Sequence, residues 1–166
     1  MYRSAGLKPT SAASATSSGG ELMNRAENYT VIVGCGRLGA SLANAISDAE
    51  GSVMMVDRNE RAFRKLDAAY GGLTLVGDAT DIAVLRSAQI ERADTVVSVT
   101  NDDNTNIMVA QIARNLYHIP NVVCRLYDPE REVVYREFGI DTICPTVLST
   151  REIDRLLGRE KEAAVR

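Results

Sequence analysis

The chain has 166 residues, 22 of them acidic and 19 basic, and a formal net charge of −3 at pH 7. This length suits one domain with its own core, and the scattered basic residues give no sign of a nucleic-acid-binding surface. No apolar stretch is long enough to span a bilayer and the N-terminus lacks the apolar core of a secretory signal, so we expect a cytoplasmic protein without direct membrane insertion.

The chain begins with a segment of biased composition. Residues 1–28 are rich in Ser, Ala, Gly and Thr and contain little that a core would bury, so we predict a flexible low-complexity tail. We place one folded domain at residues 29–158 and a C-terminal tail at residues 159–166.

The most informative segment is Thr30 to Gly39, which reads TVIVGCGRLG. An apolar run predicts a strand at residues 29–34, and the residues after the turn predict a helix at 37–49. The glycines between them suit a tight turn, a close approach of the backbone to a pyrophosphate, and close packing of helix on strand. Glycine-rich turns between strand and helix are common, so the motif alone leaves its function open. The expected apolar face of the helix comprises Leu38, Leu42, Ala45 and Ile46.

Strands and helices alternate along the rest of the domain without a long loop. Further strands are predicted at residues 53–57, 73–77, 94–99, 122–126 and 141–144. Further helices are predicted at residues 59–69, 81–88, 103–117, 129–138 and 147–157, with Asn59 and Asp128 as N-caps and Gly139 and Gly158 at C-terminal ends. The alternation predicts an α/β fold, a Rossmann-like doubly wound sheet of six parallel strands in the order 3-2-1-4-5-6. We expect its ligand crevice at the carboxyl ends of strands 1 and 4.

Polar residues follow the first two predicted strands. Arg37, inside the glycine turn, offers a fork of donors for a terminal phosphate. Asp57 ends the second strand, where its carboxylate is placed to accept both ribose hydroxyls and to repel a 2′-phosphate. The neighbouring Arg58 leaves the exclusion of a 2′-phosphate open. An alternative for Asp57 is a strand-end acid that caps the next helix.

The third strand is followed by GDATD, from Gly77 to Asp81. Asp78, Ala79 and Thr80 are placed to present backbone amides and a carboxylate to an adenine edge. Alternatively, Asp78 or Thr80 only caps the short helix that follows, and both roles are compatible.

The fourth strand is followed by a dense polar run, Thr100 to Asn106. This run has more polar groups than helix capping requires, so we expect it to line the crevice with Thr100 and Asn101 nearest the phosphates or a second ribose. Arg125, within an otherwise apolar fifth strand, needs a partner if buried, either a phosphate or an acid such as Asp102.

Cysteine and histidine give no sign of a metal site or of catalysis. Cys35, Cys124 and Cys144 are far apart in the sequence and form no CxxC pair, which argues against a disulfide framework and against zinc. Cys35 is read as a small residue that fits the turn, with oxidation sensitivity as the alternative. His118 is the only histidine and is predicted to lie at the surface near a helix C-terminus, so we predict no catalytic residue and no metal ligand.

Five motifs, GCGRLG, VDRNE, LVGDATD, TNDDNTN and CRLYDPE, occur in this order. In this order and spacing they resemble the N-terminal lobe of the RCK (regulator of K⁺ conductance) family, also called the TrkA or KTN domain, over residues 29–158. Members of that family are cytoplasmic gating subunits of Trk and Ktr potassium transporters or gating domains of channels. They assemble as dimers and rings and bind NAD(H), ATP, ADP or AMP. The resemblance therefore implies an adenine nucleotide or NAD(H) as ligand, a membrane potassium-translocating subunit as partner, and a location at the inner face of the cell membrane.

The resemblance also implies roles for single residues. The glycine turn with Arg37 is expected to hold phosphates, Asp57 the adenosine ribose, and Asp78 with Ala79 the adenine. The helix at 147–157 is expected to cross over to a partner subunit through Leu148, Ile153, Leu156 and Leu157. The chain stops at Arg166 without the second lobe of many members, so it is either a single-lobe subunit or a shortened chain, and we expect no second regulatory ligand from this sequence. The candidate nucleotide-binding residues are Gly34, Cys35, Gly36, Arg37, Leu38, Gly39, Asp57, Arg58, Asp78, Ala79, Thr80, Thr100, Asn101, Asp102 and Arg125.

Three functions fit these patterns to different degrees. The leading hypothesis is a nucleotide-sensing regulatory subunit that is not an enzyme, in which binding shifts the conformation of a ring. An NAD-dependent oxidoreductase is the alternative, but the sequence has no Tyr-x-x-x-Lys and no room for a substrate domain. A scaffold with a vestigial crevice is disfavoured because each strand end keeps its polar group.

Overall fold

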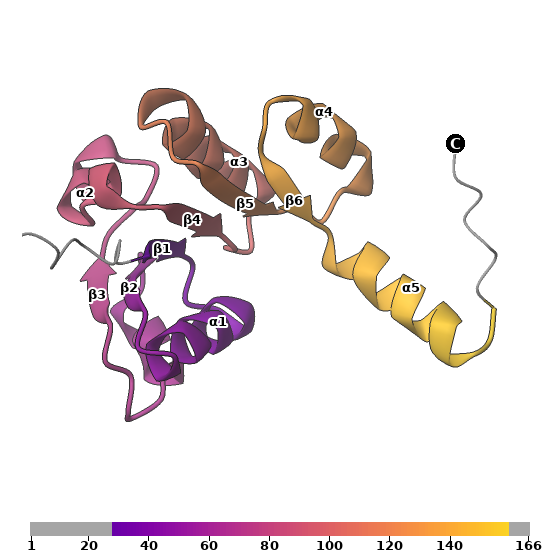
Figure 1. The fold of residues 1–166 in the computed structure, drawn as a ribbon, viewed down its shortest axis with the longest axis horizontal. Helices are drawn as coiled ribbons and strands as arrows, with labels where there is room; N and C mark the ends of the chain where they lie inside the picture. The colour runs from indigo at the N-terminus through magenta and orange to yellow at the C-terminus, as the bar shows by residue number, and fades with distance from the viewer. Residues whose placement is uncertain (1–27, 160–166) are drawn as a thin grey trace, which may run out of the picture.

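The computed structural model describes residues 28–159, so the predicted tails lie almost entirely outside the described residues. Six strands form one parallel sheet in the order β3-β2-β1-β4-β5-β6, which confirms the predicted topology (Figure 1). Their bounds are β1 (Tyr29–Val33), β2 (Ser52–Asp57), β3 (Leu73–Val76), β4 (Thr95–Ser98), β5 (Asn121–Arg125) and β6 (Asp141–Ile143).

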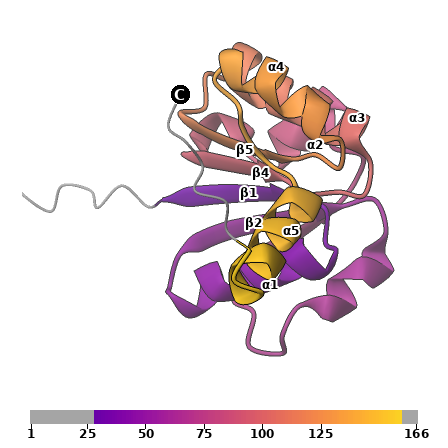
Figure 2. The ribbon, with the colours of Figure 1, turned by 90° about the vertical axis from the view of Figure 1, so that its right-hand side faces the viewer.

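Helices cover both faces of the sheet (Figure 2). On one face lie α1 (Arg37–Asp48) and a short 3₁₀ helix, η1 (Glu60–Lys65). On the other face lie α2 (Ile82–Ser87), η2 (Ile90–Arg92), α3 (Asp103–Gln111) with its π-helical continuation η3 (Ile112–Leu116), η4 (Pro129–Arg131) and α4 (Glu132–Glu137). The last helix, α5 (Pro145–Leu156), follows β6.

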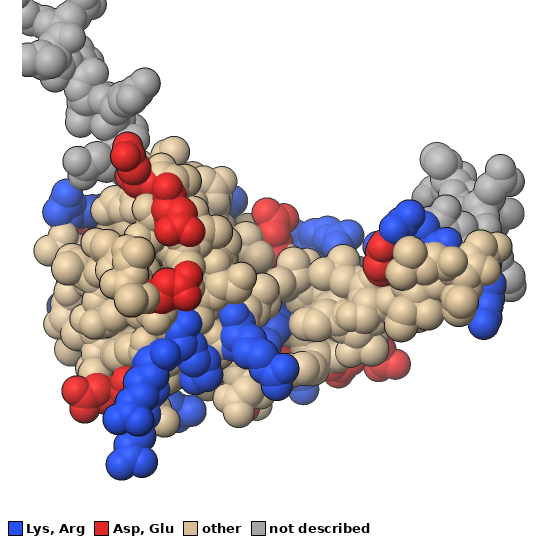
Figure 3. Space-filling view, turned by 90° about the horizontal axis from the view of Figure 1, so that it is seen from below, with Lys and Arg blue, Asp and Glu red and all other residues tan. Residues whose placement is uncertain are grey.

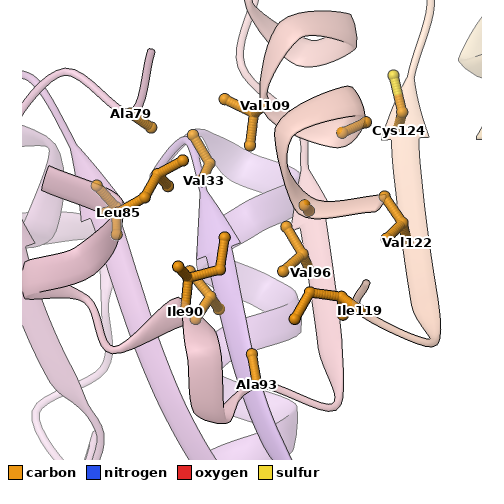
Figure 4. Packing of buried hydrophobic residues seen from close by; sticks show 14 of the residues in the cluster. Val33, Ala79, Leu85, Ile90, Ala93, Val96, Val109, Ile119, Val122 and Cys124 are labelled. Carbon is orange, nitrogen blue, oxygen red and sulfur yellow. The ribbon is translucent and has the colours of Figure 1, made fainter. Parts of the chain in front are cut away.

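The core consists of two apolar clusters, one on each face of the sheet. Val31 and Val33 of β1 point to the cluster under α2 and α3, whereas Ile32 points to the cluster under α1 and η1. The first cluster joins strands β1, β4 and β5 to Leu85, Ile90 and other residues of the covering helices (Figure 4). Because successive strand residues face opposite sides and both sides are covered, the central strands read as continuous apolar runs.

The sheet-facing side of α1 differs in part from the predicted apolar face. Its buried residues are the small ones, Gly39, Ala40 and Ala43, while Leu38 and Ala45 are exposed. A Cβ atom on Gly39 would overlap the Gly34 carbonyl oxygen and lie 3.3 Å from Val99 Cγ2. The helix approaches the sheet so closely at this point that small residues, rather than leucines, fit between the two.

The predicted helix at residues 59–69 is wrong in type and length. Asn59 caps it as predicted, by accepting a hydrogen bond from the Arg61 amide, but the element is a 3₁₀ helix that ends at Lys65. The chain beyond it is held to α1 by side chains: Asn44 accepts from the Asp67 amide and Ser47 from the Gly71 amide. These contacts replace the backbone bonds that would have continued a helix.

The C-terminal helix α5 extends away from the sheet (Figure 1). Three apolar side chains of this helix and the one directly after it are more than half exposed. They are Leu148, Ile153, Leu156 and Leu157. The space-filling view from below shows uncharged surface along this projecting part, bordered by charged groups (Figure 3). The helix thus presents an apolar face that nothing within residues 28–159 covers. No helix of this part of the chain is long and apolar enough to cross a membrane.

Candidate functional site

A cavity of about 260 Å³ lies where the carboxyl ends of the strands meet the glycine turn. This is the position at which doubly wound sheets bind ligands, because the connections leave the central strands in opposite directions there. The residues that line it are Val33, Gly34, Cys35, Gly36, Val56, Asp57, Arg58, Asn59, Ala62, Lys65, Gly77, Asp78, Ala79, Val99, Thr100, Asn101, Thr105 and Arg125.

Most of the predicted site residues meet at this cavity. The structure brings together Gly34, Cys35, Gly36, Asp57, Arg58, Asp78, Ala79, Thr100, Asn101 and Arg125. It places five others outside the lining, namely Arg37, Leu38, Gly39, Thr80 and Asp102. All three residues at the start of α1 are outside the lining: Arg37 and Leu38 are exposed, and Gly39 is buried against the sheet.

The glycine turn passes close to the end of β4. Gly34 has φ +102°, and a Cβ atom on it would lie 2.8 Å from the Thr100 amide nitrogen. Its own amide donates to the Val56 carbonyl at 2.8 Å, which ties the turn to β2. Gly36 is different, because no atom lies within 4 Å of the place where its Cβ would be. Gly36 thus lines the cavity without being packed against other parts of the chain.

Asp57 holds the glycine turn in place. One carboxylate oxygen accepts the Cys35 amide at 2.7 Å and the other accepts the Asn59 amide at 2.8 Å. Capping of η1 belongs to Asn59 rather than to Asp57. The carboxylate is half-buried, and each oxygen retains a lone pair for a ligand hydroxyl. Its role toward a ribose stays a prediction.

The carboxylate of Asp78 is held in place by Thr80, two residues further along the chain. It accepts from the Thr80 amide at 2.9 Å and from the Thr80 hydroxyl at 2.7 Å, and its other oxygen lies 3.7 Å from Arg58 Nη1. The hydrogen bonds from Thr80, with a smaller contribution from Arg58, lower the pKa of Asp78. The N-cap of α2 is Asp81, so neither Asp78 nor Thr80 caps that helix. Asp78 is therefore ionised and faces the cavity at neutral pH.

The polar run after β4 divides into capping and cavity residues. Asp102 caps α3 by accepting the Thr105 amide at 2.7 Å, and the hydrogen bonds from Thr105 lower its pKa. Asp103 accepts the Tyr127 amide, at 3.0 Å for each oxygen, and so holds the loop that follows β5. Thr100 and Asn101 line the cavity as expected.

Arg125 does not pair with Asp102, which was one of the two partners expected for it. Its Nη2 donates to the Thr100 carbonyl oxygen, and its guanidinium carbon lies 4.8 Å from the centroid of the Tyr127 ring. Its Nε is buried and has no hydrogen-bond partner in the described part of the chain. A cation with no acid beside it at a cavity wall suits an anionic ligand.

One side of the cavity was not predicted from the sequence. Asn59, Ala62 and Lys65 are spaced by three, and residues at this spacing share one face of a 3₁₀ helix. All three line the cavity. The predicted α-helix at residues 59–69 hid this pattern. The spacing of three after Asp57 is the signal that could have revealed it.

The side chains of Cys35 and His118 give no sign of catalysis within residues 28–159. The buried Cys35 thiol donates to the Ala62 carbonyl at 3.3 Å, and burial raises its pKa, so it stays protonated and poorly nucleophilic. No group of three His, Cys, Asp or Glu residues that could hold a metal ion occurs in residues 28–159. His118 is exposed, with φ +54°, in the turn before β5 and so at the other end of that strand.

Comparison with known proteins identifies the family. The TrkA-N domain model matches residues 30–146. A relative, the Trk system potassium uptake protein TrkA of Streptomyces coelicolor, is 39% identical over 132 residues, which are 79% of this chain and 57% of that protein. The TrkA homolog of Methanothermobacter thermautotrophicus is 31% identical over 136 residues, 81% of this chain and 62% of its own length. The chain thus spans about three fifths of these relatives.

Solved structures that are similar to this chain include RCK and TrkA-N domains. The GsuK RCK domain is 27% identical with a TM-score of 0.67, over 82% of this chain and 29% of that one. GsuK bound to ADP has the same identity and TM-score, over 81% and 35%. The TrkA-N domain of the inner membrane protein ybaL from Escherichia coli, 17% identical with a TM-score of 0.70 over 78% and 96%, shares the fold. The family match over residues 30–146, the parallel sheet and the glycine turn lead to one conclusion, that this chain belongs to the TrkA-N domain family.

Proposed function

We propose that this chain is the nucleotide-binding regulatory part of a potassium transport system and that it acts without catalysing a reaction. The observation that carries the proposal is the cavity at the carboxyl ends of the strands, walled by the glycine turn on one side and by Arg125 on another, whose Nε has no hydrogen-bond partner within residues 28–159. Relatives named as Trk potassium uptake proteins support the transport context.

The ligand that fits this cavity is an adenine nucleotide (AMP, ADP or ATP) or NAD(H). Backbone amides of the glycine turn and the Arg125 guanidinium offer donors to phosphates, as expected for anion sites at helix N-termini. Asp57 is assigned to the ribose, and Asp78 with Ala79 to the adenine. The structure of GsuK bound to ADP supports this choice of ligand. Arg58 and Lys65 also line the cavity, and their positive charges could bind a 2′-phosphate. A nucleotide with a 2′-phosphate is therefore tested together with the other nucleotides.

Regulation requires that the nucleotide bind one conformation of an assembly more tightly than another. A nucleotide with equal affinity for both conformations does not change the equilibrium between them. The exposed apolar face of α5 supports self-association of the domain at residues 29–158 through the crossover helix at 147–157, as a dimer or within a ring. The proposed partner is a membrane potassium-translocating subunit, which places this chain in the cytoplasm at the inner face of the cell membrane.

The composition of the cavity supports a binding role over an oxidoreductase. Within residues 28–159, no histidine or tyrosine is among the residues that line it. The acids there are engaged by backbone amides or by Thr80 and Arg58. Hydride transfer to or from NAD(H) with a simple alcohol or hydroxy acid would contradict the proposal.

Thermal unfolding with a panel of nucleotides tests the proposed function. We expect AMP, ADP, ATP or NAD(H) to raise the unfolding temperature at millimolar concentration, because a ligand that binds only the folded state stabilises it by about 2.7 kcal/mol at a hundredfold excess over Kd. NADPH tests the 2′-phosphate, and guanosine nucleotides serve as a control for nonspecific anion effects. No response to any adenine nucleotide would overturn the proposal.

Arg37 gives a separate prediction about the phosphates. It is exposed at the start of α1 and is not a lining residue, so we expect a longer phosphate chain to reach it and a single phosphate not to. We expect Arg37→Ala to weaken ATP binding by about tenfold and AMP binding by less than about twofold, as measured by calorimetry. Equal losses for the two nucleotides would refute the assignment of Arg37 to the terminal phosphate.

A further inference from the structure

The fully buried side chain of Asn106 lies behind the cavity wall. Asn106 belongs to the start of α3, is 0% exposed and is not among the lining residues. A buried amide is costly unless its polar atoms are satisfied, and a fully satisfied one fixes the groups around it.

Its two amide atoms have partners on two strands. The oxygen accepts from the Thr100 amide at 2.8 Å, the Thr100 hydroxyl at 2.7 Å and the Ser98 hydroxyl at 3.0 Å. The nitrogen donates to the carbonyl oxygens of Thr100, at 3.1 Å, and Arg125, at 3.0 Å. One side chain thus fixes the main chain where β4 and β5 end.

These two strand ends carry cavity residues. Thr100 and Arg125 both line the cavity, and the Arg125 guanidinium donates to the same Thr100 carbonyl that Asn106 holds. Loss of the Asn106 amide would release the Thr100 carbonyl and the Arg125 main chain together. The guanidinium would then lose the fixed acceptor that orients it.

We propose that Asn106 is a positioning residue that holds Thr100 and Arg125 in place for the phosphate groups of a bound nucleotide. This inference rests on the proposed function and deepens it. This role predicts a selective effect on affinity. The phosphate groups increase the affinity of the nucleotide only when Asn106 is present, whereas the affinity for the nucleoside, which binds near Asp57 and Asp78, does not depend on Asn106.

The test compares ADP with adenosine. Dissociation constants for both are measured by calorimetry on the wild type, Asn106→Ala and Ser98→Ala. Asn106→Ala is expected to reduce the preference for ADP over adenosine by about tenfold, the scale of one lost hydrogen bond to a charged group.

Ser98→Ala is the matched control, because Ser98 is equally buried and donates to the same oxygen but does not line the cavity. It is expected to lower the unfolding temperature and leave the preference within about twofold.

The near-isosteric Asn106→Asp covers the case in which Asn106→Ala does not fold, as judged by circular dichroism. Its carboxyl group still accepts from Ser98 and Thr100 but lacks the two N–H bonds of the amide, so it cannot hold both carbonyls, and the preference is again expected to fall. A folded variant that keeps the wild-type preference would overturn the inference alone. A wild type that binds adenosine as tightly as ADP would overturn it too, and a wild type that binds neither would overturn the proposed function with it.

Discussion

Replacing Gly39 with alanine is expected to destabilise the domain by about 4 kcal/mol, among the largest effects of a single methyl group. The added Cβ would overlap the Gly34 carbonyl oxygen and lie 3.1 Å from the Gly34 carbonyl carbon. Both are backbone atoms of a turn that is tied to β2 by the Gly34 amide, so they cannot move aside as a flexible side chain would. Urea unfolding followed by circular dichroism measures the loss of free energy.

Gly36→Ala is the matched control within the same motif. No atom lies within 4 Å of a Cβ on Gly36, and its φ of −77° is accessible to alanine. Its free energy of unfolding is expected to stay within about 1 kcal/mol of the wild type. Its affinity for ADP is expected to fall by about tenfold or more, because Gly36 lines the cavity and an added methyl group would hinder the close approach of the proposed phosphates to the turn. Equal destabilisation by the two substitutions would contradict the assigned division of roles.

Replacing Asp57 with alanine is expected to lower both stability and nucleotide affinity. The carboxylate accepts the Cys35 amide at 2.7 Å and the Asn59 amide at 2.8 Å, and the first of these is partly buried. Leaving the partly buried Cys35 amide without an acceptor is expected to cost about 2 kcal/mol, whereas water can replace the acceptor of the exposed Asn59 amide. The untied glycine turn and the lost ribose acceptor together are expected to weaken ADP binding by about a hundredfold. Urea unfolding and calorimetry report the two losses separately.

Asp67→Ala controls for the loss of one negative charge. Asp67 lies in the exposed stretch after η1 and contacts α1 through its amide rather than its carboxylate. This variant is expected to retain stability and ADP affinity. If Asp57→Ala lost stability but kept the wild-type affinity for ADP, Asp57 would support the fold without holding the ribose.

Much of the fold could be predicted from local signals. The central strands are apolar runs bounded by turn residues, and short connections between parallel strands allow few topologies, so the sheet order followed from the chain. Asn59, Asp128 and Gly139 end or begin their elements as predicted, because capping depends on neighbours within a few residues.

The candidate site was predictable where it depends on strand ends. Each parallel strand delivers the residue after it to the same edge of the sheet, so Gly36, Asp57, Asp78 and Thr100 reached the cavity as expected. The roles of these residues toward a ligand, and the domain boundaries at residues 29 and 158, stay predictions.

By itself, the sequence determined the strand order and the set of strand-end residues, because these follow from periodicity, glycine spacing and chain connectivity, and its five motifs carried the resemblance to the family. Only the tertiary structure decided that η1 is a 3₁₀ helix that adds Lys65 to the cavity, that Arg125 contacts Thr100 and Tyr127 instead of Asp102, and that Asn106 joins two strand ends. These features depend on hydrogen bonds and close packing between residues far apart in the chain. No local pattern encodes them, since a side chain selects its partner from whatever groups the folded sheet brings within reach.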